Sequence, residues 1–190
     1  MNLVNQEVKE RTRETLLGFN RPSLGAGVIQ SLEKELWDPL LEFYDDTFPD
    51  AAVCPPTNRS RHGNHLVTKA KFFSYFIKDG RRVTPSKSAE KAPNSIIQVE
   101  FDGRIFVGQV ISVIQHLQLR IGRPIVFTHV RWFRSSQDVD TTIWDQFPEI
   151  EIFFWKYNDC IRPGEPGPPC LITTDRIKSQ AARVLGGETN

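Results

Sequence analysis

Two long apolar runs in the middle of the chain constrain its fold more than any other feature. Residues 96–101 are followed by Asp102-Gly103, a dipeptide typical of two-residue hairpin turns, and then by the β-branched run 104–114. A third run, residues 125–133, begins after a break at residues 121–124. β-Branched and aromatic residues favour strands, so this part of the chain predicts neighbouring strands joined by short turns.

Shorter apolar runs flank these and bring the expected total to five to seven strands over residues 66–185. The shorter runs are residues 66–68, 72–77, 152–155 and 170–172, with a turn signal at Asp79-Gly80. Strands do not alternate regularly with helices, so we predict a mainly β fold (α+β overall): a small antiparallel, partly open β-barrel with N-terminal helices. Gly108 lies inside a strand and predicts a bulge or a barrel corner. The expected core includes Val110, Ile111, Val113, Val126, Val130 and Phe154.

The first 58 residues show helical spacing instead. Apolar residues recur three or four positions apart at Ile29, Leu32, Leu36, Leu40 and Phe43. Asp38 and Pro39 have the residue types of an N-cap and a first helical position, and they predict the start of a second short helix. We therefore divide the chain into a helical acidic arm (1–58), a β-barrel domain (59–185) and a disordered tail (186–190).

Charge is distributed in three blocks. Residues 1–58 hold five Lys/Arg and ten Asp/Glu, residues 59–91 hold nine and two, and residues 92–190 hold ten and eleven. The net charges are therefore −5, +7 and −1, which sum to +1. This total excludes a globally basic nucleic-acid binder but allows a local basic patch, or an acidic arm that neutralises a basic segment.

The basic block gives the candidate nucleic-acid-binding residues. They are Arg59, Arg61, Lys69, Lys71, Arg81, Arg82 and Lys87. On one exposed face they would hold phosphates, and the interleaved aromatic residues Phe72, Phe73, Tyr75 and Phe76 would allow base stacking. The alternative, which we weigh more heavily, is a solvated edge strand and loop, because lysines commonly protect exposed edges.

A second candidate site is an aromatic pocket for a methylated lysine, built from Trp132, Phe133, Trp155 and Tyr157. Side chains alternate along a strand, so Trp132 and Phe133 point to opposite faces and one of them belongs to the core. Core and rim packing is the favoured interpretation of these aromatic residues.

No pattern in the chain indicates catalysis or a metal site. No nucleophile is paired with a base, and Asp138, Asp140 and Asp145 fall in a polar connection where turns account for them. Zinc ligation by Cys54, His62 and His65, with Cys160 or Cys170, matches no paired-ligand spacing. We therefore predict no enzyme activity, no metal, no cofactor and no small-molecule substrate.

Location is constrained by cysteines and hydropathy. Three cysteines are an odd number, which favours a reducing compartment, nuclear or cytoplasmic. The sequence has no run of 18 apolar residues, so we predict no membrane span. The early charge at Glu7 argues against a secretory signal.

Several short segments also occur in an order that suggests a family. They are His62-Gly63-Asn64-His65-Leu66-Val67-Thr68, Ser74-Tyr75-Phe76-Ile77, the run 108–116, Val130-Arg131-Trp132-Phe133, Phe147-Pro148-Glu149 and the run 177–183. In this order, residues 61–185 resemble a β-rich region near the C-terminus of transposon-derived proteins of mushroom-forming fungi. A similar region accompanies transposases of the plant CACTA type.

The order is also similar to a bromo-adjacent-homology (BAH) barrel. Such barrels have a Gly-x-Val-like strand, here Gly108 to Val110, and then an Arg-Trp-Phe-like strand, here Arg131 to Phe133. The resemblance implies a non-catalytic nuclear binding module, a remnant of a mobile-element protein, that contacts DNA, other nucleic acid or a chromatin protein. The alternative is a structural or protein-interaction domain with no ligand of its own.

Overall fold

The computed structural model describes residues 22–58, 63–88, 93–135, 155–162 and 164–181. The fold is mainly β, as predicted, and its strands are antiparallel apart from one two-residue parallel pair. The helical elements are η1 (Lys34–Leu36), α2 (Trp37–Thr47), η2 (Pro49–Ala51), η3 (Ser86–Ser88), η4 (Pro93–Ser95) and η6 (Thr174–Arg176). The strands are β1 (Ser23–Leu24), β2 (Gly27–Ser31), β3 (Val53–Cys54), β4 (Asn64–His65), β5 (Lys69–Phe73), β6 (Phe76–Lys78), β7 (Arg81–Val83), β8 (Ile96–Phe101), β9 (Arg104–Leu117), β10 (Pro124–Ser135), β11 (Trp155–Cys160), β12 (Leu171–Thr173) and β13 (Ile177–Gln180).

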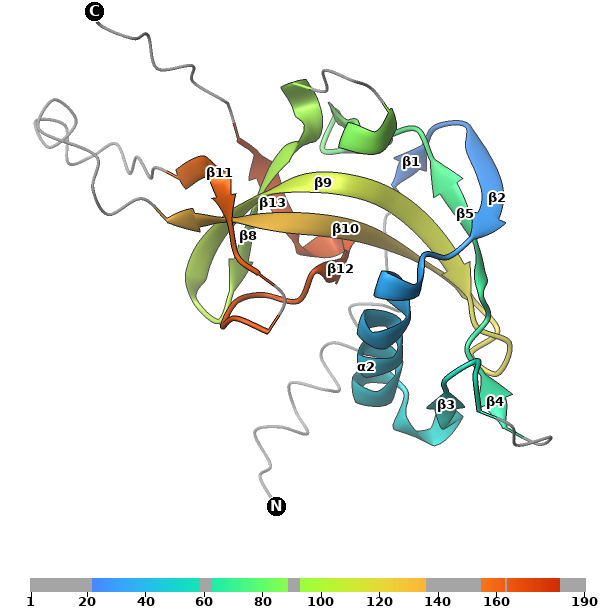
Figure 1. Ribbon diagram of the computed structural model, residues 1–190. Helices are drawn as coiled ribbons and strands as arrows, with labels where there is room; N and C mark the ends of the chain where they lie inside the picture. The colour runs from blue at the N-terminus through green and yellow to red at the C-terminus, as the bar shows by residue number, and fades with distance from the viewer. Residues whose placement is uncertain (1–21, 59–62, 89–92, 136–154, 163, 182–190) are drawn as a thin grey trace, which may run out of the picture.

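The long strands β9 and β10 form the centre of an eight-stranded sheet (Figure 1). The other edge of β9 pairs with β8 along its first half and with β5 near its end. Beyond β5 lies the edge strand β2, and beyond β8 lies β13. Both hairpin turns expected from Asp-Gly dipeptides are present. Asp79-Gly80 has φ values of 50° and 73°, as does Asp102-Gly103, which is the positive-φ geometry of a type I′ turn.

A second sheet of three strands, β1-β6-β7, packs on the large one. The two sheets do not close into a barrel. Across the seam between the small sheet and the segment of η6 and β13, the described contacts come from side chains. Gln180 Nε2 of β13 donates to the Arg82 carbonyl of β7 at 2.6 Å, and Lys78 Nζ of β6 donates to the Asp175 carbonyl of η6 at 2.9 Å. A cavity of about 260 Å³ lies in this seam.

The predicted helical arm requires correction at its second half. Residues 27–31 form strand β2, and α2 begins only at Trp37. The apolar spacing around Ile29 fits a helix, but the β-branched pair Val28-Ile29 instead extends along β5 in an unbroken antiparallel register. Pro39 is in the first turn of α2, where free N–H groups make proline tolerable, although the N-cap is Leu36 and not Asp38.

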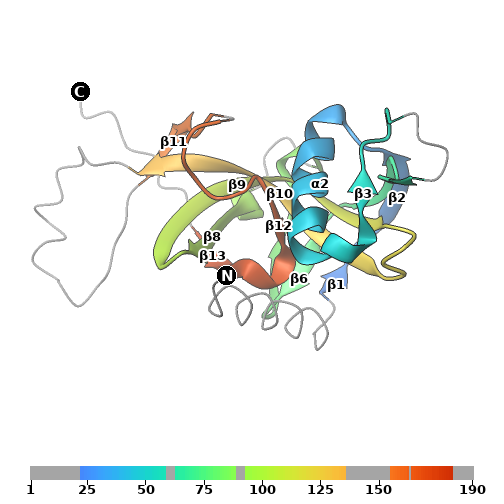
Figure 2. The ribbon, with the colours of Figure 1, turned by 90° about the horizontal axis from the view of Figure 1, so that it is seen from below.

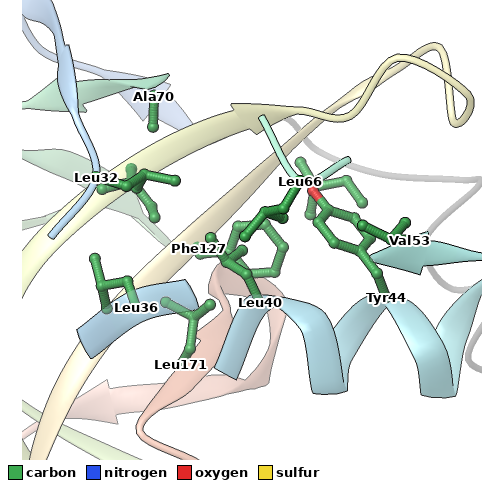
Figure 3. Close-up of a cluster of buried hydrophobic side chains, with 11 residues drawn as sticks. Leu32, Leu36, Leu40, Tyr44, Val53, Leu66, Ala70, Phe127 and Leu171 are labelled. Atoms are coloured by element: carbon green, nitrogen blue, oxygen red, sulfur yellow. The ribbon is translucent and has the colours of Figure 1, made fainter. Parts of the chain in front are cut away.

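Helix α2 covers one face of the large sheet, and the small sheet covers the opposite face (Figures 1 and 2). Under α2, Leu40 and Tyr44 pack with Phe127 of β10 (Figure 3). Ile114 of β9 belongs to the same buried cluster. On the opposite face the small sheet buries Phe76 and Val83 against a second cluster that includes Val110, Val113, Val130 and Trp132. A third cluster, around Ile96, Val107 and Phe133, lies near β11.

Most of the predicted core is buried. Val110, Ile111, Val113 and Val130 are at most 6% exposed, whereas Val126 is half-buried and Phe154 lies outside the described residues. The bulge is at Ile111, because the β9–β10 register shifts where Ser112 pairs with His129 and Val110 with Val130. Gly108 therefore does not mark the bulge. It lies opposite Trp132, where an added Cβ would meet the Trp132 ring at 2.7 Å, so glycine permits this close approach.

Candidate polyanion-binding face

Lys69 and Lys71 lie on the face of the large sheet opposite α2. Between them, Ala70 is part of the cluster beneath the helix, together with Leu40 and Tyr44. Side chains alternate along a strand, so both lysines project to the other face, and both are exposed. Helix α2, which carries four carboxylates, therefore does not lie on these two lysines.

Lys71 belongs to a row of side chains that crosses four strands. Ile29 of β2 is paired with Lys71, Lys71 with Gln115, and Gln115 with Val126. The Lys71 ammonium is 5.4 Å from the centre of the Phe73 ring. The row forms a face that is partly cationic and partly apolar.

Arg81 and Arg82 point to opposite faces of β7, although the sequence hypothesis needed them on one. Arg82 is paired with Ile77, and its guanidinium lies 4.0 Å from the centre of the Tyr75 ring. Arg81 is paired with Lys78 and lines the seam cavity with Val83. Because Val83 is buried beneath the small sheet, Arg82 is on the outer side of that sheet.

The basic residues of the sequence prediction thus fall into separate groups. Lys69 and Lys71 lie on the face of the large sheet away from α2, and Arg82 lies on the outer side of the small sheet that packs on that face. We call these three residues the basic face. Lys87 lies elsewhere and pairs with Glu33 at 2.6 Å. Arg59 and Arg61 lie outside the described residues.

The sequence hypothesis assigned base stacking to the aromatic residues interleaved with this basic segment, but these residues are not available for it. Phe73 and Phe76 are 7% and 0% exposed and belong to the core under the small sheet. Phe72 packs against the cluster beneath α2, and the half-buried Tyr75 is covered by Arg82. Contact with a polyanion through the basic face therefore depends on phosphates and not on bases.

The four residues of the aromatic-pocket candidate do not converge. Trp132 and Phe133 are 3% and 4% exposed and belong to clusters on opposite faces. The Trp132 indole donates to the Pro169 carbonyl at 3.0 Å. Phe133 packs instead with Tyr157, at 5.3 Å between ring centres, and with Trp155, both of which are half-buried. These contacts favour the core interpretation.

A buried polar network that sequence reasoning missed joins α2 to the end of β9. The Tyr44 hydroxyl lies 2.7 Å from His116 Nδ1, and His116 Nε2 lies 2.7 Å from the Val67 carbonyl. A carbonyl only accepts, so Nε2 carries the proton and Nδ1 accepts from Tyr44. Burial lowers the pKa of His116, which matches this neutral form.

Gln118 extends the network to the segment before β5. Its Oε1 accepts from the Val67 amide at 3.0 Å, and its Nε2 donates to Asn64 Oδ1 at 3.0 Å and to the His65 carbonyl at 2.9 Å. Asn64 in turn donates to the Ala51 carbonyl at 2.7 Å. Each of these side-chain groups has a hydrogen-bond partner, which is the mark of a structural network.

The cysteine and histidine candidates form one pair. Cys54 Sγ is 3.4 Å from His65 Nδ1, across the short parallel pair of β3 and β4. Cys160 lies on β11 and Cys170 precedes β12, while His62 is outside the described residues. In the part of the chain that the structure describes, no three His, Cys, Asp or Glu residues are grouped so as to hold a metal.

Comparison with known proteins gives no relative, since no family model, curated protein or solved structure matches the chain. The transposon-derived and BAH-like resemblance therefore remains a sequence prediction. Among the described residues, no helix combines the length and hydropathy that crossing a lipid bilayer requires.

Proposed function

We propose that the chain is a non-catalytic binding module that holds the phosphates of a nucleic acid on its basic face. One observation favours this function over the others. Lys69 and Lys71 are exposed on the face of the large sheet away from α2, Arg82 is exposed on the outer side of the small sheet that packs on that face, and no carboxylate of the described residues pairs with them. Unpaired cations on an exposed face suit phosphate contacts, which hold nucleic acid without reading its sequence.

The proposal also explains why the acidic residues of α2 are where they are. Among the described residues, the carboxylates of α2 lie on the other face of the large sheet from Lys69 and Lys71, so they do not neutralise these two lysines directly. A polyanion would approach the basic face in preference to the helix. Nuclear location and contact with chromatin, implied by the family resemblance, belong to the same proposal.

The test is the salt dependence of binding to a labelled DNA duplex, measured by fluorescence anisotropy. Each phosphate contact contributes roughly −0.9 to the slope of log affinity against log salt concentration. The change Arg82→Gln is therefore expected to flatten the slope by about 0.9, and Lys69→Gln with Lys71→Gln by about 1.8.

Arg81→Gln is the matched control, because Arg81 is adjacent in sequence but faces the seam. It should leave the slope unchanged. Equal effects of Arg81→Gln and Arg82→Gln would show that this face does not hold the phosphates. A folded protein that fails to bind DNA at low salt would exclude the function altogether.

A protein-interaction module is the second candidate. It is favoured by the burial of the aromatic residues and by exposed apolar side chains at one end of the large sheet, among them Ile29 and Leu119. Absence of DNA binding at low salt would leave this candidate in place.

A further inference from the structure

Strand β2 ends the large sheet and has an unpaired edge within the described residues. It pairs only with β5, at the far right of the sheet in Figure 1. The Ser74 amide donates to the Ala26 carbonyl, and the Leu32 amide donates to the Thr68 carbonyl, so even-numbered residues bond toward β5. Along a strand, the backbone N–H and C=O groups of successive residues point alternately to its two edges. Those of Gly27, Ile29 and Ser31 therefore point away from β5, to the free edge of β2.

This edge lacks the features with which proteins usually protect an exposed strand. Its sequence, Gly-Val-Ile-Gln-Ser, has no lysine, no proline and no charge. Val28 and Ile29 are 60% and 70% exposed, and both are β-branched residues that favour strand pairing. An edge of this kind pairs readily with another extended segment.

We infer that β2 pairs with β2 of a second copy of this chain. The reason is self-complementarity in the antiparallel register centred on Ile29. There Ile29 faces Ile29 of the second copy, and Gly27 faces Ser31 in both directions. All three outward residues of each strand then satisfy their N–H and C=O groups, and Val28 meets Gln30 on the other face.

Charge does not oppose this arrangement. β2 itself is neutral, and the nearest cation on the Ile29 face is Lys71 of the next strand. The two copies of Lys71 would be three strand spacings apart, about 14 Å at the usual interstrand distance. That separation exceeds the Debye length of about 8 Å at physiological ionic strength, so their repulsion is largely screened.

Two short strands bury less area than a standard protein interface, so the dimer should be weak and should dissociate on dilution. Sedimentation of the full chain from low to high micromolar concentration tests this. The wild type is expected to pass from monomer to dimer. Ile29→Lys, which adds an edge lysine at a position already 70% exposed, is expected to stay monomeric. Leu119→Lys is the control, since Leu119 is 76% exposed but lies in the turn after β9, and it should dimerise like the wild type.

Hydrogen exchange locates the contact. At high concentration, the amides of Gly27, Ile29 and Ser31 should gain protection, while those of Val28 and Gln30, already bonded to β5, should change little. A wild type that is monomeric throughout, or a dimer that persists in Ile29→Lys, overturns the inference. Protection of Gly27, Ile29 and Ser31 in the monomer would overturn it too, because another segment of the same chain would then cover the edge.

Discussion

The Tyr44 hydroxyl donates a hydrogen bond of 2.7 Å to His116 Nδ1, although 72 positions separate the two residues in the chain. Both side chains are fully buried. Burial raises the pKa of Tyr44 and lowers that of His116, so both stay neutral. The bond fixes α2 to β9 at a defined register, which an apolar contact alone specifies less well.

Replacing Tyr44 by Phe should destabilise the fold by about 1–3 kcal/mol, because His116 Nδ1 would remain buried without its donor. Urea denaturation measures the change in the free energy of unfolding. Tyr75→Phe is the control. Tyr75 is only half-buried, so removal of its hydroxyl should cost less than about 0.5 kcal/mol. Equal costs for the two variants would show that the bond to His116 contributes nothing to stability.

Gln118→Ala should be more damaging than Tyr44→Phe. It removes three hydrogen bonds at once and leaves the Val67 amide and Asn64 Oδ1 without this partner in the interior. Each buried group without a partner costs about 1–3 kcal/mol, so we expect these two groups to cost at least about 2 kcal/mol in total. The free energy of unfolding in urea is again the measurement. A loss below about 1 kcal/mol would mean that water molecules take over the hydrogen bonds of the Gln118 side-chain amide.

The strand pattern was predictable from sequence because its signals are local. The Asp102-Gly103 turn and the apolar runs beside it predicted β8 and β9, and both are present. The prediction of a helix around Ile29 was wrong because the apolar spacing of this segment fits either a helix or an edge strand. Pairing with β5, more than 35 positions away, decides the outcome.

The candidate site was predictable only in part, for the same reason. Alternation along a strand is local, and it correctly placed Trp132 and Phe133 on opposite faces. The same rule separates Arg81 from Arg82, whereas the count of charges along the chain groups them. The network around His116 had no comparable signal, since its members are scattered and a single histidine after an apolar run is ordinary. How far the two sheets close on each other depends on how two strand edges meet across the seam, which no local pattern encodes.

Gly108→Ala should destabilise the protein by about 1–3 kcal/mol through overpacking. The new Cβ would lie 2.6 Å from Val130 Cγ1 and 2.7 Å from the Arg131 carbonyl oxygen. The carbonyl is part of the β10 backbone and cannot move without disturbing its pairing with β9. Urea denaturation gives the cost, and near-ultraviolet circular dichroism should report a changed environment of Trp132. Wild-type values in both would contradict the packing described here.

His129 should make stability depend on pH between about 6.5 and 4. Burial, reinforced by the nearby Lys87 and Arg131, lowers the pKa of His129 from 6.5 to about 4 in the folded protein, although Glu33 acts in the opposite direction. Below pH 6.5 the unfolded chain takes up a proton that the folded chain does not, so stability falls as the pH falls. The loss approaches about 3 kcal/mol by pH 4 and is absent above pH 7. His129→Gln should flatten this part of a plot of unfolding free energy against pH, and an unchanged slope would exclude His129 as the cause.

The Glu33 and Lys87 side chains should shift the His129 titration in opposite directions. They form an exposed ion pair, and each acts on His129 with its own sign. Lys87→Gln removes a repelling cation and leaves the carboxylate, so the pKa of His129 should rise. Glu33→Gln removes the attracting carboxylate and leaves the cation, so the pKa should fall. Both variants break the same ion pair, which makes each the control for the other. NMR titration of the His129 ring protons measures the pKa in both variants. A pKa that changes in the same direction in both would show that loss of the ion pair alters the structure around His129, and that the individual charges are not the cause.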